Sequence, residues 1–175
     1  YAPAFIDKLR NSGHDVTFIT DEKSIINGDL LFLLGCGTIL SDEKLKYNKH
    51  NLVVHPSQLP EGRGSAALVW KILEGENKIF ITLFEASTKL DRGDIYLQDY
   101  ILLEGHELSD EIRHIQALKI LELVFKFIEH YQFIKSKKQI GKGSFFPKRT
   151  SKDSELDINK SIAEQINLLR VVDNE

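Results

Sequence analysis

The sequence predicts an α/β fold with a mostly parallel sheet, and two observations support this. Short apolar runs at 29–34 and 52–55 have the pattern of strands that are buried on both faces of a parallel sheet. Segments in which apolar residues recur at helical spacing alternate with these runs, and the longest extends from Glu107 to about Tyr131. Alternating strands and helices are typical of α/β domains.

Composition sets limits on the class of protein. The chain has 175 residues, which suits one domain with a real core. A net charge of −3 argues against a nucleic-acid binder driven by phosphate contacts, although a local basic patch is compatible with it. Cys36 is the one cysteine, which excludes an internal disulfide and favours a cytoplasmic location. No apolar run approaches the roughly 18 residues of a membrane span, so we expect no membrane partner.

The first elements follow from local patterns. A helix is expected over 3–11 and is closed by Gly13. The β-branched residues at 16–20 predict a strand. The run 29–34 leads into a tight turn at 35–38, where two glycines permit close backbone approach. Because the chain opens inside a helix and contains no Met, we expect the N-terminal strand of the fold to be missing.

The alternation continues through the middle of the chain. A short helix is expected from Ser41, and a helix that stops at a glycine is expected over 65–75. Strands are expected at 52–55, 80–85 and 95–98.

The composition changes after Gln132. The stretch 135–142 is basic, 143–149 reads as an extended strand or linker, and 161–172 has helical spacing. We therefore divide the chain into a domain over 1–131 and, over 132–175, a linker with the start of a C-terminal extension. The basic stretch from Lys135 to Arg149 is interpreted as a solvated linker, with contact to a phosphorylated substrate as the alternative.

Two loops that adjoin predicted strands carry the candidate chemistry. His55 ends the run 52–55 and enters a Pro-bounded loop that reaches Pro60 and is followed by Arg63-Gly64. Asp91 lies in a second loop, 89–95, next to the strand expected at 80–85. Loops at strand ends are where α/β proteins usually place functional side chains. One histidine and one aspartate so placed predict a proton-transfer site.

In their order along the chain, these motifs resemble the folate-dependent formyltransferases. That family carries an N-x-H-x-S-x-L-P loop, an R-G pair, a helix ending before Gly and an L-D-x-G-[DP]-I loop, matched here by 54–60, 63–64, 67–75 and 90–95. The resemblance covers about 28–107, and 149–158 is similar to the stretch that follows the catalytic domain in the tRNA and sugar branches. It implies a Rossmann-like formyltransferase fold that binds N10-formyltetrahydrofolate and transfers its formyl group to an amine.

The resemblance places His55 and Asp91 on two of the family's three catalytic positions. As an amine attacks the formyl carbon, negative charge develops on oxygen and positive charge on nitrogen. A protonated imidazole at His55 would stabilise that oxygen, and the carboxylate of Asp91 would orient the imidazole and help to move the proton off the amine.

The third position departs from the family. Its Asn lies two residues before the His, where this chain has Val53. Asn51 is four residues before His55 and about 7 Å beyond the expected place, so it is a weaker candidate. Ser57 and a backbone N–H of the loop are alternatives for the same role.

The resemblance implies that backbone groups of three segments hold the formyl donor. Matched here, they are Gly37, Thr38 and Ile39; Ser57, Gln58, Leu59 and Pro60; and Ser87, Thr88, Lys89 and Leu90. The pterin is expected in an apolar slot near Leu34 and Cys36.

Other residues are interpreted without a functional role. Asp94 rivals Asp91, but the family pattern places the catalytic carboxylate before Gly93, so Asp94 is expected to be a turn or strand-start residue. The remaining histidines are expected to be surface or helix-face residues: His14, His50, His106, His114 and His130. Cys36 is expected to be a small buried filler, because no cysteine or histidine spacing typical of a metal site is present. Gly35-x-Gly37 lacks the third glycine of a dinucleotide fingerprint.

The resemblance leaves the acceptor open. The first interpretation is a cytoplasmic homodimer that formylates a nucleotide-linked amino sugar for surface-glycan biosynthesis and binds no nucleic acid. The alternatives are a methionyl-tRNA formyltransferase and a non-catalytic module that binds folate without turnover.

Overall fold

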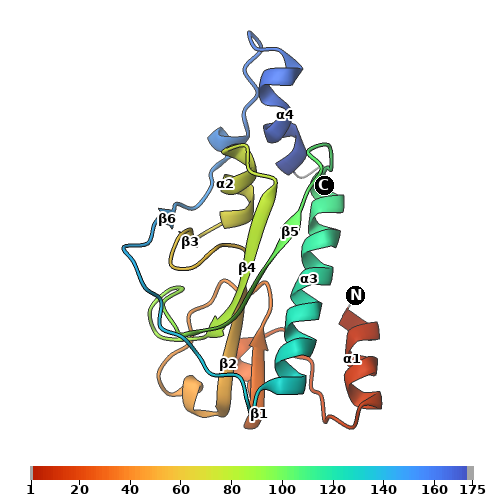
Figure 1. The fold of residues 1–175 in the computed structure, drawn as a ribbon, viewed down its shortest axis with the longest axis vertical. Coiled ribbons are helices and arrows are strands. Elements are labelled where there is room, and N and C mark those ends of the chain that lie inside the picture. The colour runs from red at the N-terminus through yellow and green to blue at the C-terminus, as the bar shows by residue number, and fades with distance from the viewer. Residues whose placement is uncertain (1, 173–175) are drawn as a thin grey trace.

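The computed structural model describes residues 2–172, with a mixed sheet at its centre (Figure 1). The sheet order is β1-β2-β4-β5, and a second, two-stranded sheet joins β3 to β6. The strands are β1 (Gly28–Leu33), β2 (Asn48–His55), β3 (Arg63–Gly64), β4 (Lys78–Glu85), β5 (Ile95–Leu102) and β6 (Phe145–Phe146). The α-helices are α1 (Ala2–Asn11), α2 (Ala67–Leu73), α3 (Ser109–His130) and α4 (Ile162–Val171). Short 3₁₀ turns lie at Glu22–Ser24, Lys44–Lys46 and Ser151–Ser154.

The α/β class is confirmed, but the pairing differs in detail from a mostly parallel sheet. In the four-stranded sheet β1 and β2 are parallel, whereas β2–β4 and β4–β5 are antiparallel. Element lengths explain the reversal. The seven residues of α2 span only about 10 Å, and the eight residues of β2 span about 26 Å. The chain therefore enters β4 near the end at which β2 finishes, and the two strands run in opposite directions.

One face of the sheet packs on α3 (Figure 1). Leu52 and Val54 of β2 and Leu83 of β4 share this buried cluster with Val124 and Phe127 of α3. Helix α1 covers the other side of α3, where the rings of Phe5 and Phe125 meet edge to face at 4.8 Å. His55 lies on the opposite face of β2 from Leu52 and Val54, because side chains alternate along a strand.

The residues after α3 return to the domain. Strand β6 pairs with β3, and the indole of Trp70 in α2 donates a hydrogen bond to the carbonyl of Pro147. Helix α4 packs against α2, and its Arg170 is only 1% exposed. This return brings residues from 137 onward close to the loop that follows His55.

One predicted element is wrong, and β1 is less buried than expected. No strand forms at 16–20, where β-branched composition is present but no ladder partner occurs among the described residues. The short helix expected from Ser41 forms as a 3₁₀ helix at Lys44–Lys46. Strand β1 is half-buried rather than covered on both faces, because it lies at an edge of the sheet.

Within residues 2–172, none of the helices has the length and apolar character that crossing a membrane would require.

Candidate functional site

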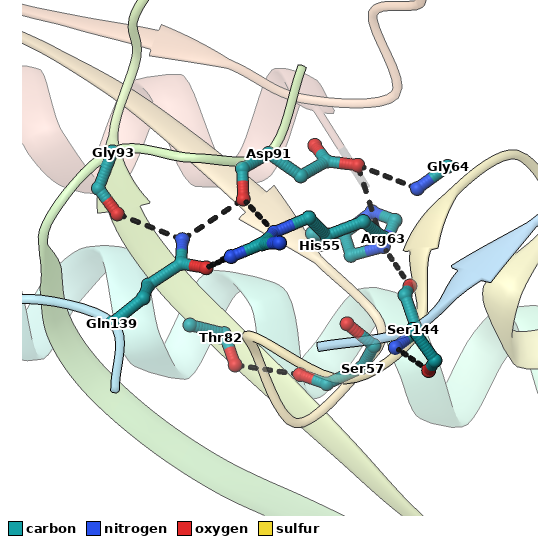
Figure 2. Close-up of polar contacts among 10 residues, drawn as sticks. His55, Ser57, Arg63, Gly64, Thr82, Asp91, Gly93, Gln139 and Ser144 are labelled. Atoms are coloured by element: carbon teal, nitrogen blue, oxygen red, sulfur yellow. Dashed lines mark hydrogen bonds and ion pairs between the residues drawn. The ribbon is translucent and has the colours of Figure 1, made fainter. Parts of the chain in front are cut away.

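Three segments far apart in the sequence meet at the end of β2 (Figure 2). The first is the loop after His55, the last residue of β2. The second is the connection between β4 and β5, which carries Asp91. The third comprises residues 137–146, which we call the return segment.

His55 and Asp91 form a buried pair. Their exposed fractions are 9% and 8%, and Nε2 of His55 lies 3.8 Å from Oδ2 of Asp91. The same Nε2 is 2.8 Å from the carbonyl oxygen of Gly62. Because a carbonyl can only accept, this contact assigns a proton to Nε2. The other ring nitrogen, Nδ1, is then the one that can bind or release a proton.

Asp91 is held by its backbone as well as by its side chain. Oδ2 accepts a 2.8 Å hydrogen bond from the N–H of Gly64, and the backbone φ is +51°. Positive φ is uncommon outside glycine, and aspartate is one of the residues that tolerate it. Ala66, the N-cap residue directly before α2, has φ +55°, so both non-glycine residues with positive φ among the described residues lie around this site.

Arg63 contacts the main chain of Asp91. Its Nε donates to the Asp91 carbonyl at 3.1 Å, and Nε and Nη2 donate to Oε1 of Gln139 at 3.2 and 2.6 Å. Burial lowers the pKa of Arg63, and the nearby charge of Arg92 adds to this effect while Asp91 opposes it. Arg63 stays charged, because the pKa of an arginine starts far above neutrality.

The return segment closes the site from a third side (Figure 2). The side-chain N–H groups of Gln139 donate to the carbonyls of Asp91 and Gly93 at 2.8 and 2.9 Å. Oγ of Ser144 accepts from the N–H of Gly62 at 2.8 Å, and the Arg63 N–H donates to the Ser144 carbonyl at 3.1 Å. The basic stretch is therefore not only a solvated linker, because it contacts both the loop after His55 and the Asp91 loop.

A pocket of about 360 Å³ opens beside His55. Its lining includes the turn 35–37, the first residues of α2 and α3, and Arg170 of α4. Cys36 lines it and is exposed, so the expectation of a buried filler is wrong: the turn after β1 is open to solvent. Leu34 is 39% exposed and is not part of the lining.

The segments predicted to hold the formyl donor differ in exposure. Gly37 lines the pocket, and Thr38 and Ile39 beside it are exposed. In the loop after His55, Gln58 is exposed, Pro60 is half-buried, and Ser57 and Leu59 are buried. In the Asp91 loop, Ser87 is half-buried and its hydroxyl donates to the Lys89 carbonyl at 2.9 Å, while Thr88, Lys89 and Leu90 are exposed.

Ser57 has an unusual hydroxyl. Oγ is buried and has no hydrogen-bond partner within residues 2–172. The Ser57 carbonyl accepts from Oγ1 of Thr82 at 2.6 Å, and Thr82 lies opposite His55 in the sheet. A buried hydroxyl without a partner costs free energy unless something else satisfies it. Ser57 is not among the residues that line the pocket, although its neighbour Pro56 is.

Asn51 belongs to a different cluster. Its side-chain N–H donates to the Leu45 carbonyl at 2.9 Å, and its backbone N–H donates to Glu85 at 2.7 Å. Within the described chain it contacts neither His55 nor Asp91, and four residues of strand separate it from His55 by about 13 Å. Val53, at the family's Asn position, lies opposite Phe84.

The same cluster corrects the surface placement of His50. Its Nδ1 is 3.1 Å from Oε2 of Glu85, and the Tyr96 hydroxyl donates to that oxygen at 2.9 Å. Burial raises the pKa of Tyr96, and the hydrogen bond to Glu85 adds to this. His50 also meets the ring of Phe127 edge to face, so it is half-buried against α3.

The placements predicted for the other histidines and for Asp94 agree with the structure. His14, His106, His114 and His130 are exposed, as expected. Asp94 is half-buried, and its carbonyl accepts from the N–H of Glu85 at the start of the loop. A group of three or more side chains suited to a metal ion is not found within 2–172.

Sequence reasoning missed two contributors to the site. Arg63 belongs to the R-G pair at 63–64. An arginine directly after the loop that His55 enters is a signal that could have identified it. Gln139 stands among lysines and glycines without a local pattern, so no sequence signal pointed to it.

Comparisons with known proteins give the family. The formyl transferase family matches residues 5–119. The methionyl-tRNA formyltransferase of Clostridioides difficile (strain 630) is 31% identical over 163 residues, which are 90% of this chain and 52% of that protein. The chain thus spans about half the length of the curated relatives that it matches.

Solved structures share the fold. Methionyl-tRNA formyltransferase from Clostridium thermocellum superposes with a TM-score of 0.84 at 22% identity, covering 99% of this chain and 78% of that one. A 4-N formyltransferase from Francisella tularensis gives 0.70 at 21% identity, covering 97% and 72%. HypX from Aquifex aeolicus in complex with tetrahydrofolic acid gives 0.74 at 22%, covering 84% and 26%. With its fold, its His55–Asp91 pair and the match over 5–119 taken together, this chain belongs to the formyl transferase family.

Proposed function

We propose that this protein transfers a formyl group from N10-formyltetrahydrofolate to a primary amine. The observation that carries the proposal is the buried His55–Asp91 pair, 3.8 Å apart at the edge of a pocket. Family membership supports the class of reaction, and the tetrahydrofolate complex of the HypX neighbour supports the class of donor.

The residues present fit such a donor. The pocket volume lies within the range usual for small-molecule sites. The hydroxyl of Ser57, two residues after His55, has no partner within residues 2–172. It would donate a hydrogen bond to a polar group of the donor or to the reacting formyl oxygen. Gly37, which lines the pocket, and the loop from Ser57 to Pro60, which follows the pocket residue Pro56, would hold the donor, which supplies the formyl carbon when bound.

The chain's own groups would then divide the work. His55, protonated on both nitrogens, would donate from Nδ1 to the formyl oxygen as negative charge grows there. Asp91 would stabilise the imidazolium through Nε2 and favour loss of one proton from the attacking amine. The new bond joins the amine nitrogen to the formyl carbon, the bond from that carbon to N10 breaks, and N10 gains a proton. Ser57 takes the supporting role on the oxygen that Asn51 is too remote to play.

For the acceptor we propose a nucleotide-linked amino sugar, because a net charge of −3 does not suit a polyanionic partner. Methionyl-tRNA is the second candidate, and the relative from Clostridioides difficile, at 31% identity, favours it.

The test uses the full-length protein with N10-formyltetrahydrofolate and a panel of acceptors. The panel contains amino-sugar nucleotides, methionyl-tRNA and uncharged tRNA, and products are detected by mass spectrometry. We expect a formylated sugar, whereas formyl-methionyl-tRNA would select the second candidate. Tetrahydrofolate binding without any formylated product would contradict the proposed catalysis.

His55→Ala tests the mechanism. We expect transfer to fall by a factor of about 10² to 10⁴, which is typical for loss of a general acid or base, while calorimetry shows tetrahydrofolate binding retained. His14→Ala, at an exposed position, is the matched control and should keep full activity. Retained transfer in His55→Ala would overturn the assignment.

A further inference from the structure

We propose that Gln139 is a positioning residue, which fixes the Asp91 carboxylate relative to His55 by holding the main chain of the Asp91 loop. This inference rests on the proposed function of the His55–Asp91 pair. It assigns a role to a side chain that lies beyond the stretch matched by the family, 5–119.

The four hydrogen bonds of the Gln139 amide join the Asp91 loop to Arg63. Its two N–H donations go to the carbonyls of Asp91 and Gly93, on either side of Arg92. Its Oε1 accepts from Arg63, whose Nε also donates to the Asp91 carbonyl. One planar amide thus ties two main-chain oxygens of the loop to the arginine that follows the His55 loop.

The Asp91 loop needs such a brace because its conformation is unfavourable by itself. Asp91 has φ +51°, and a non-glycine residue persists there only when its surroundings determine it. The loop also passes close to the end of β4, because a Cβ at Gly93 would lie 1.6 Å from the carbonyl oxygen of Glu85, and only glycine fits there. Rotation of the Asp91 backbone would carry its carboxylate away from Nε2 of His55, so main-chain restraint sets the 3.8 Å separation.

Gln139 is itself held on both sides. Two residues earlier, Lys137 and Ile95 exchange backbone hydrogen bonds of 2.8 Å each. A few residues later, Ser144 binds the main chain of Gly62 and Arg63. A side chain anchored in this way loses little freedom on making its contacts, so it can restrain the loop rather than follow it.

The chemistry of the contact requires an amide. Glutamate has the same size but would present an oxygen, in place of two N–H donors, to two carbonyl oxygens. Alanine removes all four contacts. Both variants should therefore free the loop, although only alanine changes the volume of the side chain.

The experiment compares Gln139→Ala and Gln139→Glu with Gln132→Ala, an exposed glutamine just after α3. In full-length protein, with whichever acceptor the panel identifies, we expect both Gln139 variants to lower kcat by about 10- to 100-fold. The KM for N10-formyltetrahydrofolate should change by less than about threefold, because interactions made only in the transition state are lost. Gln132→Ala should match the wild type, and wild-type kcat in Gln139→Glu would overturn the proposal.

A double-mutant cycle separates positioning from general structural support. If Gln139 acts through Asp91, Gln139→Ala should lower kcat by less than about threefold in an Asp91→Asn background. A full additional 10- to 100-fold loss in that background would overturn the proposal.

Amide hydrogen exchange of residues 87–94 supplies a readout that needs no acceptor. We expect faster exchange in Gln139→Ala than in Gln132→Ala, with unchanged exchange in α3. Unchanged exchange at 87–94 would contradict the brace even if no acceptor in the panel were formylated, an outcome that would count against the proposed function alone.

Discussion

A buried arginine stands beside a buried carboxylate at two places in this molecule, and the two places differ in what the arginine binds. At the junction of α3 and α4, Arg170 pairs with the carboxylate of Glu107 at 3.4 Å, and Asn77 and Asn167 accept further hydrogen bonds from it. At the candidate site, Arg63 donates a hydrogen bond to the main-chain carbonyl of Asp91.

The two carboxylates therefore differ in their hydrogen-bond partners. The carboxylate of Glu107 accepts from the N–H groups of Glu104 and Gly105 in addition to Arg170. All of these contacts tie it to the surrounding structure. Within residues 2–172 the carboxylate of Asp91 accepts a hydrogen bond from the N–H of Gly64, and it faces His55 at 3.8 Å. An arginine that holds the backbone leaves a carboxylate free to act on an imidazole, whereas one that holds the carboxylate makes an anchor.

The largest effect is expected at the anchor. Arg170→Ala leaves Glu107 buried without its cation and should lower the free energy of unfolding by about 3–5 kcal/mol. Urea unfolding followed by Trp70 fluorescence measures this. Lys160→Ala, at an exposed position, is the control and should change stability by less than about 0.5 kcal/mol. A loss below 1 kcal/mol for Arg170→Ala would show that the anchor does not hold α4.

At the candidate site the matching substitution is Asp91→Asn, which should lower activity without destabilising the fold. In Asp91→Asn the amide oxygen can still accept from Gly64, and asparagine tolerates positive φ. We expect kcat to fall about 100- to 1000-fold, since the variant removes the charge facing His55, with little change in Tm. Asp94→Asn, at the rival aspartate, is the control and should stay near wild type. Equal losses of kcat in the two variants would remove the distinction between them.

Acid pH should weaken the anchor in a defined window. Burial of Glu107 opposes its ionisation, but backbone N–H groups, including those of Glu104 and Gly105, together hold its pKa at about 2. Because this value lies below the ordinary one near 4.5, the ionised form stabilises the fold above about pH 5, and this contribution is lost as pH falls toward 2.

Linkage then gives a loss of about 2 kcal/mol by pH 3. The free energy of unfolding, measured from pH 7 to 3 in wild type and Glu107→Gln, separates the contribution of Glu107 from that of the other carboxylates. The wild type should lose about 2 kcal/mol more than the variant over that range. Parallel pH profiles for the two proteins would contradict the assignment.

Much of the fold could be predicted from sequence because its signals are local. The stripe of apolar residues that predicts a helix from Glu107 to Tyr131 gives α3 to within two residues, and the glycine at 75 closes α2 as expected. The strand at 16–20 was mispredicted because β-branched composition does not supply a ladder partner. The direction of β4 also depended on the length of α2, which the apolar pattern alone does not determine.

Some features of the candidate site could likewise be predicted from the sequence, and others could not. The proximity of His55 and Asp91 could be predicted, because both residues lie in loops at strand ends and match one ordered set of motifs. The displacement of Asn51 from the site followed from counting residues along β2. The role proposed for Gln139 could not be predicted, because its contacts join residues 46 to 76 positions apart and leave no periodic trace.

The distance along the chain between Gln139 and its partners has a consequence for biosynthesis. Gln139 follows Asp91 by 48 residues, and Ser144 follows Gly62 by 82. At typical translation rates of about 5–20 residues per second, Gln139 leaves the ribosome about 2–10 s after Asp91. Contacts that close such long loops also form late in folding, because chain entropy opposes them. A nascent chain can thus complete β2, β4 and β5 before the brace arrives, so the candidate site matures after the sheet that carries it.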